Sequence, residues 1–497
     1  MVSRRGFLLG SVLVPTAFAV GCAGGTSTPT SGPGPATRPL PIPPLLPSAV
    51  GTDGVRRFTL DARAGSTEMV PGRSTPTWGY SGSVLGPTIR ARRGEQVEFT
   101  ITNTLPEATS VHWHGMHLPA ASDGGPHQMI APGAVWRPSW TIGQQAATLW
   151  YHPHPHGATE KHVQRGLAGF FLIDDDAADA LGLPDDYGVD DIPLVLQDRR
   201  FTPAGEIDES DPTDIGLLGD TIVTNGIAGA HLAVGTERVR LRVLNGSPGR
   251  LYNLAFADDR AFALIATDGG LLPEPVELRR LQLSPGERAE LVVTLRPGET
   301  AVLRSLPITD RAGIDRAAEF GFDDTFDLLE LRAAADLRSS PALPTSLIPL
   351  APLVPAHTPP TRTFDLQWFM INNQRMDMNR IDLTVPVDTI EVWQVRNHDN
   401  WPHNFHIHDV QFQILTVDGA PPPPALAGWK DTVYTSSGVT YTLAMRFADH
   451  TDPTFPYMYH CHLLHHEDQG MMGQFLVLAP GMSATPRAMA MAGMDHG

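Results

Sequence analysis

The chain repeats one pattern three times, and this repetition limits the folds open to it. Each copy has a turn followed by a segment in which polar and apolar residues alternate, and each ends in an asparagine. The copies cover residues 86–103, 231–245 and 383–397, so 142 residues separate Asn103 from Asn245 and 152 separate Asn245 from Asn397. A period this long indicates duplicated domains rather than a solenoid of short repeats.

The alternation has the two-residue period of β-strands. Gly and Pro are frequent between the alternating segments, and few windows show a helical period. These features predict an all-β chain of antiparallel β-sandwiches, and 497 residues leave room for three of them. We expect domains over 51–178, 179–350 and 351–480, divided near three aspartates at 174–176 and within the proline-rich stretch 341–360.

The N-terminal 50 residues are predicted to be targeting and linker segments. In residues 1–22, Arg4-Arg5 precedes a short apolar run, which resembles a twin-arginine export signal. The run ends at Cys22, within a stretch that resembles a lipoprotein cleavage box, so Cys22 is either lipidated or removed in plain secretion. We therefore expect a protein that is exported folded and is extracytoplasmic, membrane-anchored or otherwise secreted or periplasmic. Residues 23–50, rich in Pro, Ser, Thr and Gly, are predicted to form a disordered tether.

Charge and cysteine content narrow the possible partners. A formal net charge of −18 argues against nucleic acid and anionic lipid as partners. The chain has only two cysteines, Cys22 and Cys461. With Cys22 at the signal boundary, no disulfide is expected.

The segments that follow the three repeat asparagines differ in metal-ligating residues. His-Trp-His follows the first copy at 112–114, and a segment with three histidines follows the third at 402–408. The corresponding segment of the second copy, 246–253, has no metal ligand. Metal sites are therefore expected between the first and third domains, with the second domain as a spacer that helps to shape a cleft.

Four segments carry a histidine-x-histidine pair. On a strand, residues two apart face the same side, so each pair can bind a common metal cluster. Eight histidines suit three metal ions, two ligands on one ion and three on each of the others. The pairs are His112 and His114, His152 and His154, His406 and His408, and His460 and His462.

Cys461 lies between the two histidines of the last pair and should point to the opposite side. A thiolate, imidazoles and a thioether within a few residues are the ligands of a blue-copper site, which has two histidines, one cysteine and a weak axial methionine. Strand parity places His403 on the side of Cys461. His466 can be the second histidine if the chain turns at 463–464. Met471 is the expected axial ligand, with Met472 as the alternative.

Four motifs together resemble those of the three-domain multicopper oxidases, in the group of bacterial laccases, cuprous oxidases and bilirubin oxidases. The motifs are HWHG, HPH, HNFHIH and HCHLLHHEDQGMM, and the resemblance covers 51–480. It implies three consecutive cupredoxin-like Greek-key β-sandwich domains and four copper ions, one of type 1, one of type 2 and two of type 3.

The resemblance also implies which residues bind each copper. Type 1 copper would take His403, Cys461, His466 and Met471. Type 2 copper would take His112 and His406. The two type 3 coppers would take His114, His152 and His462, and His154, His408 and His460. Seven other histidines are expected not to be ligands: His117, His127, His156, His162, His398, His450 and His465.

The function implied by the resemblance is laccase-like. Single electrons from a phenolic, aromatic or metal-ion donor would enter at type 1 copper and reduce O2 to water at the trinuclear cluster. Asp123 and Glu467 match acidic positions that assist oxygen reduction in the family, and the alternative for each is an ordinary solvated carboxylate. A monomer is expected, because one chain supplies the complete inter-domain site.

Other functions remain as alternatives. A cuprous oxidase for copper tolerance is disfavoured, since 320–430 lacks a methionine-rich insertion, but residues 481–497 carry soft ligands that could catch Cu(I) or form a plain disordered end. These ligands are Met482, Met489, Met491, Met494 and His496. A non-turnover copper-binding or electron-carrier protein would not need eight histidines. A copper-free scaffold would have lost ligands, and a zinc hydrolase gives no use for Cys461.

Overall fold

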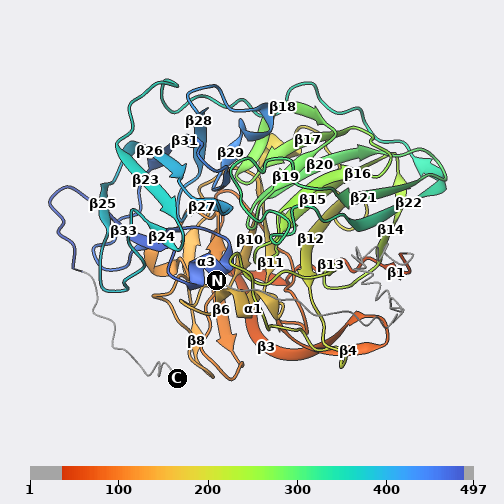
Figure 1. Cartoon of the computed structure of the whole chain (residues 1–497), viewed down its shortest axis with the longest axis horizontal. Helices are drawn as coiled ribbons and strands as arrows, with labels where there is room; N and C mark the ends of the chain where they lie inside the picture. The colour runs from red at the N-terminus through yellow and green to blue at the C-terminus, as the bar shows by residue number, and fades with distance from the viewer. Residues whose placement is uncertain (1–35, 486–497) are drawn as a thin grey trace, which may run out of the picture.

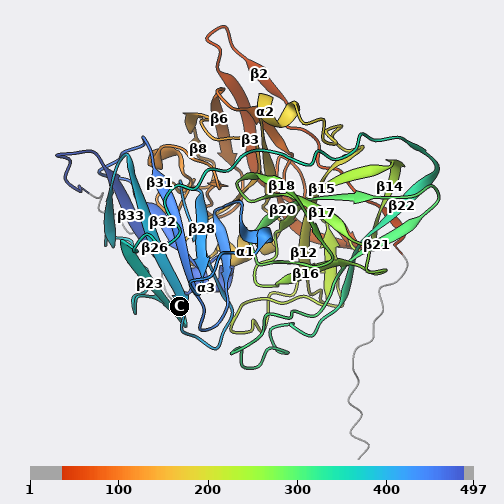
Figure 2. The ribbon, with the colours of Figure 1, turned by 90° about the horizontal axis from the view of Figure 1, so that it is seen from above.

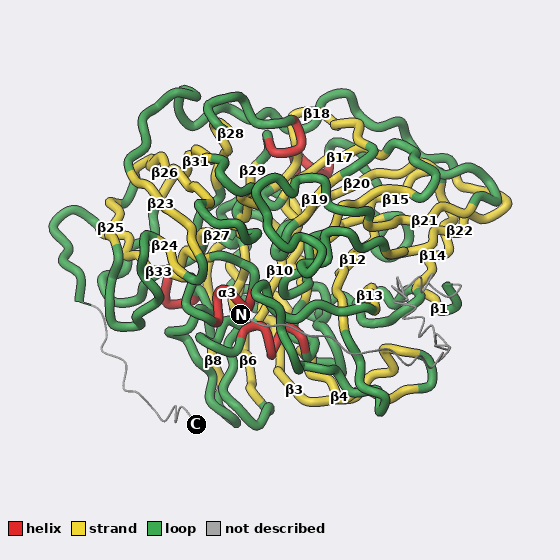
Figure 3. Tube along the Cα trace, viewed as in Figure 1, coloured by secondary structure: helices red, strands yellow, loops and turns green. Residues whose placement is uncertain are grey.

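The computed structural model describes residues 36–485. Strands and loops make up nearly all of the described chain, and the few helices are short (Figure 3). Six sheets form three β-sandwiches, which surround a common centre (Figures 1 and 2). The predicted all-β, three-sandwich architecture is confirmed.

The first sandwich holds two of the four histidine pairs, one on the edge strand that ends a four-stranded sheet and one at and just after the end of the strand beside it. Its larger sheet orders β2 (Ser48–Val50), β3 (Arg56–Val70), β6 (Gln96–Asn103) and β8 (Val135–Trp136), with β4 (Arg73–Tyr80) on β3 and β9 (Ser139–Thr141) on β6. The facing sheet orders β5 (Ile89–Arg92), β11 (Gly169–Asp174), β10 (Ala147–His152) and β7 (His112–His114). Phe99, Trp113 and Trp140 pack between the sheets with ring centroids 4.4 to 5.3 Å apart. Because Trp113 belongs to β7, this aromatic core fixes the position of that strand.

The second sandwich has two six-stranded sheets around an aliphatic core. One sheet orders β1 (Arg38–Pro39), β14 (Ala230–Thr236), β22 (Phe326–Arg338), β21 (Thr300–Ser305), β16 (Tyr252–Phe256) and β19 (Leu281–Leu283). The other orders β13 (Thr221–Thr224), β12 (Asp191–Arg199), β15 (Arg238–Asn245), β20 (Arg288–Thr294), β17 (Phe262–Thr267) and β18 (Gly270–Leu278).

The third sandwich carries the other two histidine pairs and the cysteine. One sheet orders β24 (Met370–Ile371), β23 (Arg362–Gln367), β26 (Thr389–Asn397), β31 (Thr440–Phe447), β28 (Phe412–Val417) and β29 (Trp429–Lys430). The other orders β25 (Leu383–Pro386), β33 (Met472–Leu478), β32 (Tyr457–His460), β27 (His403–Ile407) and β30 (Thr432–Thr435). The short helices α1 (Thr159–Gln164) and α3 (Leu464–Asp468) pack against each other near the centre (Figure 1). Helix α2 (Asp176–Asp179) follows β11 (Figure 2).

The repeat seen in the sequence is a repeated structural unit. Asn103, Asn245 and Asn397 end β6, β15 and β26, and each of these strands pairs in parallel with an earlier strand of its own sandwich. All three side chains are buried, donate from Nδ2 to two carbonyl oxygens, and accept from the backbone N–H two residues on. The asparagine therefore fixes the start of the loop that follows, and in two of the three sandwiches that loop leads to histidines.

The segment before the first sandwich corrects one expectation. A disordered tether was expected over 23–50, but residues 36–50 are ordered. β1 pairs with β14 of the second sandwich and β2 pairs with β3 of the first. Between them, Leu40 is buried in the second core, and the hydroxyl of Tyr187 donates to Pro43 O at 2.7 Å. Buried apolar contacts and strand pairing offset the chain entropy that the composition favours.

Several expectations lie wholly or partly outside the described residues. These are the export signal at 1–22, residues 23–35, and the tail beyond 485. Within 36–485, no helix is long and apolar enough to cross a membrane. The sheets change between Asp174 and Asp191 and again between Arg338 and Arg362, and the domain limits drawn from the sequence at 178 and 350 fall inside those intervals.

The repeat asparagine generates a stability prediction. We expect Asn245→Ala to lower the free energy of unfolding by about 3 kcal/mol, because it leaves buried backbone groups without partners. Denaturant unfolding of the copper-free protein measures this. The exposed Asn379 provides the control, and Asn379→Ala should change stability by less than about 0.5 kcal/mol. Equal effects of the two changes would contradict the assigned role.

Candidate metal centres

Three donor atoms converge beside Cys461. His403 begins β27, Cys461 follows β32, and His466 lies in α3. Cys461 Sγ lies 3.7 Å from His403 Nδ1 and 3.5 Å from His466 Nδ1, and the two nitrogens are 3.0 Å apart. All three side chains are buried. One small cation could contact all three donors.

Met471 lies close to this group. Its carbonyl accepts from Cys461 N at 3.1 Å, and its N–H donates to His466 O at 2.9 Å. Its side chain is buried in the same apolar cluster as Cys461. Met472 instead pairs with His460 in the β32–β33 ladder. These contacts place the backbone of Met471 directly beside Cys461 and His466.

The Nε2 atoms of His403 and His466 contact other groups of the protein. His466 Nε2 donates to Asp214 O at 2.9 Å, and His403 Nε2 lies 3.4 Å from Asp399 Oδ2. Such contacts fix the ring orientation and direct Nδ1 to the sulfur. Asp214 belongs to the second sandwich, so this domain contributes directly to the site.

Burial determines the protonation of these groups. It raises the pKa of the Cys461 thiol to about 12 and lowers the pKa of His466 well below its usual range. A thiolate at this position therefore requires a positive charge within the site, such as a bound metal ion.

The eight paired histidines form one contiguous site between the first and third sandwiches. Each is at most 1% exposed. His460 Nε2 lies 3.2 Å from His154 Nε2 and 3.3 Å from His408 Nε2. Triplets of their donor atoms lie within 4.8 Å of one another, and these include His112 with His114 and His152, His112 with His406 and His408, and His154 with His408 and His460.

The unpartnered nitrogens of this site fit bound metal ions. Buried polar groups are nearly always hydrogen-bonded, yet several ring nitrogens here have no partner among the described residues. They are Nε2 of His112, His152 and His406, Nδ1 of His114, and both nitrogens of His462. Burial lowers the pKa values well below the usual range for His114, His152, His154, His406, His408 and His462. The rings are therefore neutral, which is the form that binds metal.

In four of the eight histidine rings, Nδ1 lies beside a backbone carbonyl oxygen. Nδ1 of His112, His152, His406 and His460 lies 2.8 to 3.1 Å from the carbonyl oxygens of Asp123, Pro153, Asp431 and Cys461, respectively. His114 is reversed, because its Nε2 donates to Asp431 Oδ1 at 2.9 Å. Its Nδ1 is then the nitrogen left for a metal ion.

Both acidic residues singled out in the sequence contact this site. Asp123 Oδ2 lies 2.8 Å from His408 Nδ1. Glu467 lies 3.2 Å from His154 Nδ1 and 3.3 Å from His460 Nδ1, and it accepts from Thr159 Oγ1 at 2.6 Å. Burial raises the pKa of Glu467 well above its usual range. Both side chains are buried, so neither is an ordinary solvated carboxylate, which was the alternative for each.

Two further residues of the site were not found from the sequence. Asn404 Oδ1 accepts from the His462 N–H at 2.5 Å and lies 3.5 Å from Cys461 Sγ, while Asn404 Nδ2 donates to Pro285 O of the second sandwich. Asp431 holds His114 and His406. Both residues gain their roles from contacts across domains, which no local pattern marks.

The seven histidines expected not to be ligands are absent from the donor groups named above. Six of them contact a protein group: His117 with Asp409, His127 with Gln474, His162 with Glu107, His398 with Asp365, His450 with Asp449 and His465 with Glu160. His156 Nδ1 is buried and has no partner among the described residues.

Three β-sandwiches with a Cys461 site beside an eight-histidine site define a copper-dependent oxidoreductase. Comparison with known proteins agrees. Two family models described as multicopper oxidase match residues 62–178 and 350–480. The chain belongs to the multicopper oxidase family. The family implies two small partners, O2 as electron acceptor and a reductant as donor.

Relatives in the family carry different names. The cell division protein FtsP of Salmonella typhimurium is 37% identical over 449 residues, which are 88% of this chain and 93% of that protein. Multicopper oxidase mco of Staphylococcus haemolyticus is 34% identical over 442 residues, 88% and 92% of the two chains. The crystal structure of a laccase from Pediococcus acidilactici superposes with a TM-score of 0.81 at 35% identity, covering 90% of this chain and 95% of that one.

The run His152-Pro153-His154-Pro155-His156 offers a direct test of the ligand geometry. We expect His152→Ala to lower the copper bound per chain, because His152 Nε2 is buried and unpartnered within the eight-histidine site. His156→Ala is the matched control and should leave the copper content unchanged. Elemental analysis of purified protein measures both, and a loss with His156→Ala alone would reverse the assignment.

Proposed function

We propose that the chain binds four copper ions and is a laccase-like oxidase. The type 1 site comprises His403, Cys461, His466 and Met471. The type 2 site comprises His112 and His406. The type 3 sites comprise His114, His152 and His462, and His154, His408 and His460. The observation that carries the proposal is the placement of Cys461, whose sulfur belongs to one donor group while the rings of its two neighbours in sequence belong to the other.

Copper at these sites supplies one-electron oxidation of a donor and four-electron reduction of O2 to water. The chain provides the connection, because only a few covalent bonds separate the sulfur of Cys461 from the rings of His460 and His462. Asn404 stabilises this connection by contacting both Cys461 and His462. Glu467 holds a proton beside His154 and His460, since burial raises its pKa. Asp123 orients His408.

The proposed function extends to the electron donor and to the cellular location of the protein. Phenolic or aromatic compounds and metal ions are the donors, and oxidation of Cu(I) for copper tolerance is the second possibility. The protein is exported folded by the twin-arginine route, then anchored through Cys22 or secreted, and acts as a monomer.

The other classes fit the site less well. An electron carrier needs only the Cys461 group, whereas eight further histidines are buried together. A copper-free scaffold on the same fold is another alternative. Such a scaffold has no need to keep unpartnered nitrogens in a buried site, because each one costs stability.

Oxygen consumption with different donors tests the proposal. We expect the copper-loaded protein to be intensely coloured and to consume O2 with a bulky phenol. Initial rates with the phenol, Fe(II) and Cu(I) in one buffer, with and without added Cu(II), separate a laccase from a metallo-oxidase. Deletion of 481–497 should leave phenol oxidation intact. A colourless protein that is inert with every donor would refute the proposal.

A further inference from the structure

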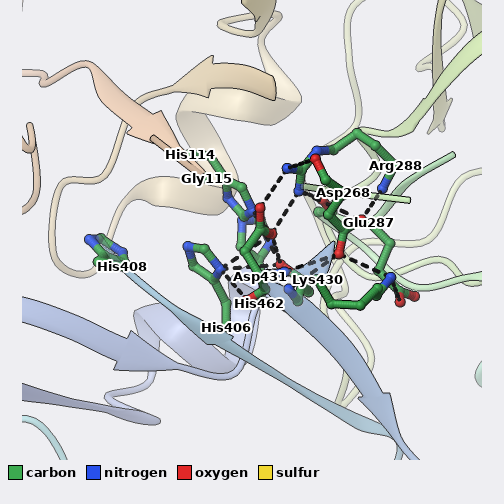
Figure 4. A network of polar contacts seen from close by, with 12 residues as sticks. His114, Gly115, Asp268, Glu287, Arg288, His406, His408, Lys430, Asp431 and His462 are labelled. Atoms are coloured by element: carbon green, nitrogen blue, oxygen red, sulfur yellow. Dashed lines mark hydrogen bonds and ion pairs between the residues drawn. The ribbon is translucent and has the colours of Figure 1, made fainter. Parts of the chain in front are cut away.

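A buried charged network of the second sandwich reaches the histidines, although this domain supplies none of the proposed ligands (Figure 4). Its centre is Arg288 at the start of β20, whose side chain is 0% exposed. Arg288 donates from NH1 to Asp431 Oδ1 at 2.7 Å and from NH2 to Asp431 Oδ2 at 2.6 Å. This paired contact fixes the plane of the carboxylate.

The remaining donors of Arg288 are also used. Nε donates to Thr148 O, NH1 to Gly286 O and NH2 to Asp268 O, each at 3.0 Å. A guanidinium has five N–H donors, and here all five have an acceptor. Arg288 is therefore fixed by contacts with all three sandwiches.

Asp431 transmits this restraint to two histidines of different proposed copper sites. Its Oδ1 accepts from His114 Nε2 at 2.9 Å, and its carbonyl oxygen accepts from His406 Nδ1 at 2.8 Å. These contacts leave Nδ1 of His114 and Nε2 of His406 unpartnered among the described residues. The orientation of both rings thus depends on where Asp431 is held.

The charged network lies so close to the loop after β7 that it restricts Gly115, the last residue of the HWHG motif. Gly115 has a φ of +84°, and a side chain on it would press against Asp431 and lie 2.8 Å from Arg288 NH2. Glycine is required because the network and the loop after β7 pass each other without space for a Cβ atom.

The charges of the network do not balance by themselves. Lys430 Nζ lies 3.0 Å from Asp268 Oδ2 and 2.7 Å from Glu287 Oε1. With Arg288 and Asp431, two cationic groups face three carboxylates, so the fully ionised network has one excess negative charge. Buried ion pairs contribute little net stability against desolvation. Cations bound by the adjacent histidines would offset the excess charge.

We propose that Arg288 is a positioning residue for the trinuclear copper site. It holds Asp431 so that His114 presents Nδ1 and His406 presents Nε2 to the metal ions. This inference rests on the proposed function, because it assumes that these histidines bind copper. It gives the second sandwich a role in oxygen reduction.

Arg242 of β15 provides a matched control. It also makes a paired contact with a buried aspartate, from Nε to Asp191 Oδ1 at 2.6 Å and from NH2 to Asp191 Oδ2 at 3.0 Å. Its NH1 donates to Thr148 Oγ1 of the first sandwich at 2.9 Å. Among the described residues, none of its hydrogen-bond or ion-pair partners is a histidine. Arg242→Lys therefore removes a comparable inter-domain contact without affecting the copper site.

The experiment compares Arg288→Lys and Arg242→Lys with the parent. Copper per chain, visible and near-ultraviolet absorption, O2 consumption and thermal unfolding of the copper-free protein are measured. We expect Arg288→Lys to keep the visible colour of the Cys461 site but to lose trinuclear copper or its absorption, with a 10- to 100-fold loss of O2 consumption. Arg242→Lys should keep the copper content, both absorption features and the O2 consumption of the parent.

Asp431→Asn provides an independent variant if Arg288→Lys does not fold. It should show the same selective loss, and the double variant should lose no more than either single variant, because both changes act through one contact. Parent-like copper content and turnover in Arg288→Lys or Asp431→Asn would overturn the inference, as would equal losses in the Arg288 and Arg242 variants. A parent protein that binds no copper would instead refute the proposed function.

Discussion

Neighbouring side chains of an extended segment point to opposite faces, and this constraint organises the whole site. Cys461 follows the end of β32, so its sulfur meets His403 and His466 while His460 and His462 turn toward the first sandwich. Two donor groups are thus joined by one short stretch of backbone. Metals bound at the two groups would be connected without any cofactor or mobile carrier between them.

The second sandwich, which supplies none of the proposed ligands, completes the site. The carbonyl of Asp214 holds His466, Pro285 O holds Asn404, and Arg288 holds Asp431. Each contact acts on a group that touches a sulfur or an imidazole. The three-domain arrangement therefore contributes to the orientation of the histidine rings.

Much of this was predictable because it depends on local periodicity. Alternation and spacing predicted three β-sandwiches, and the same parity predicted that His403 would lie beside Cys461 and that the paired histidines would gather. The pattern could not reveal Asp431 or Arg288, since each gains its role from a residue more than 100 positions away. The composition of residues 36–50 predicted a disordered tether. This prediction was wrong, because Leu40 and two short strands bind the segment to the sandwiches.

The central claim is that the sulfur at position 461 carries electrons to an oxygen-reducing group of copper ions. Replacing that sulfur with oxygen, in Cys461→Ser, tests it most directly. Visible absorption and O2 consumption should be measured on a variant whose copper-free form unfolds at the parent's temperature. We expect the colour to disappear and O2 consumption to fall to background, whereas O2 consumption at the parent's rate would contradict electron transfer through the Cys461 sulfur.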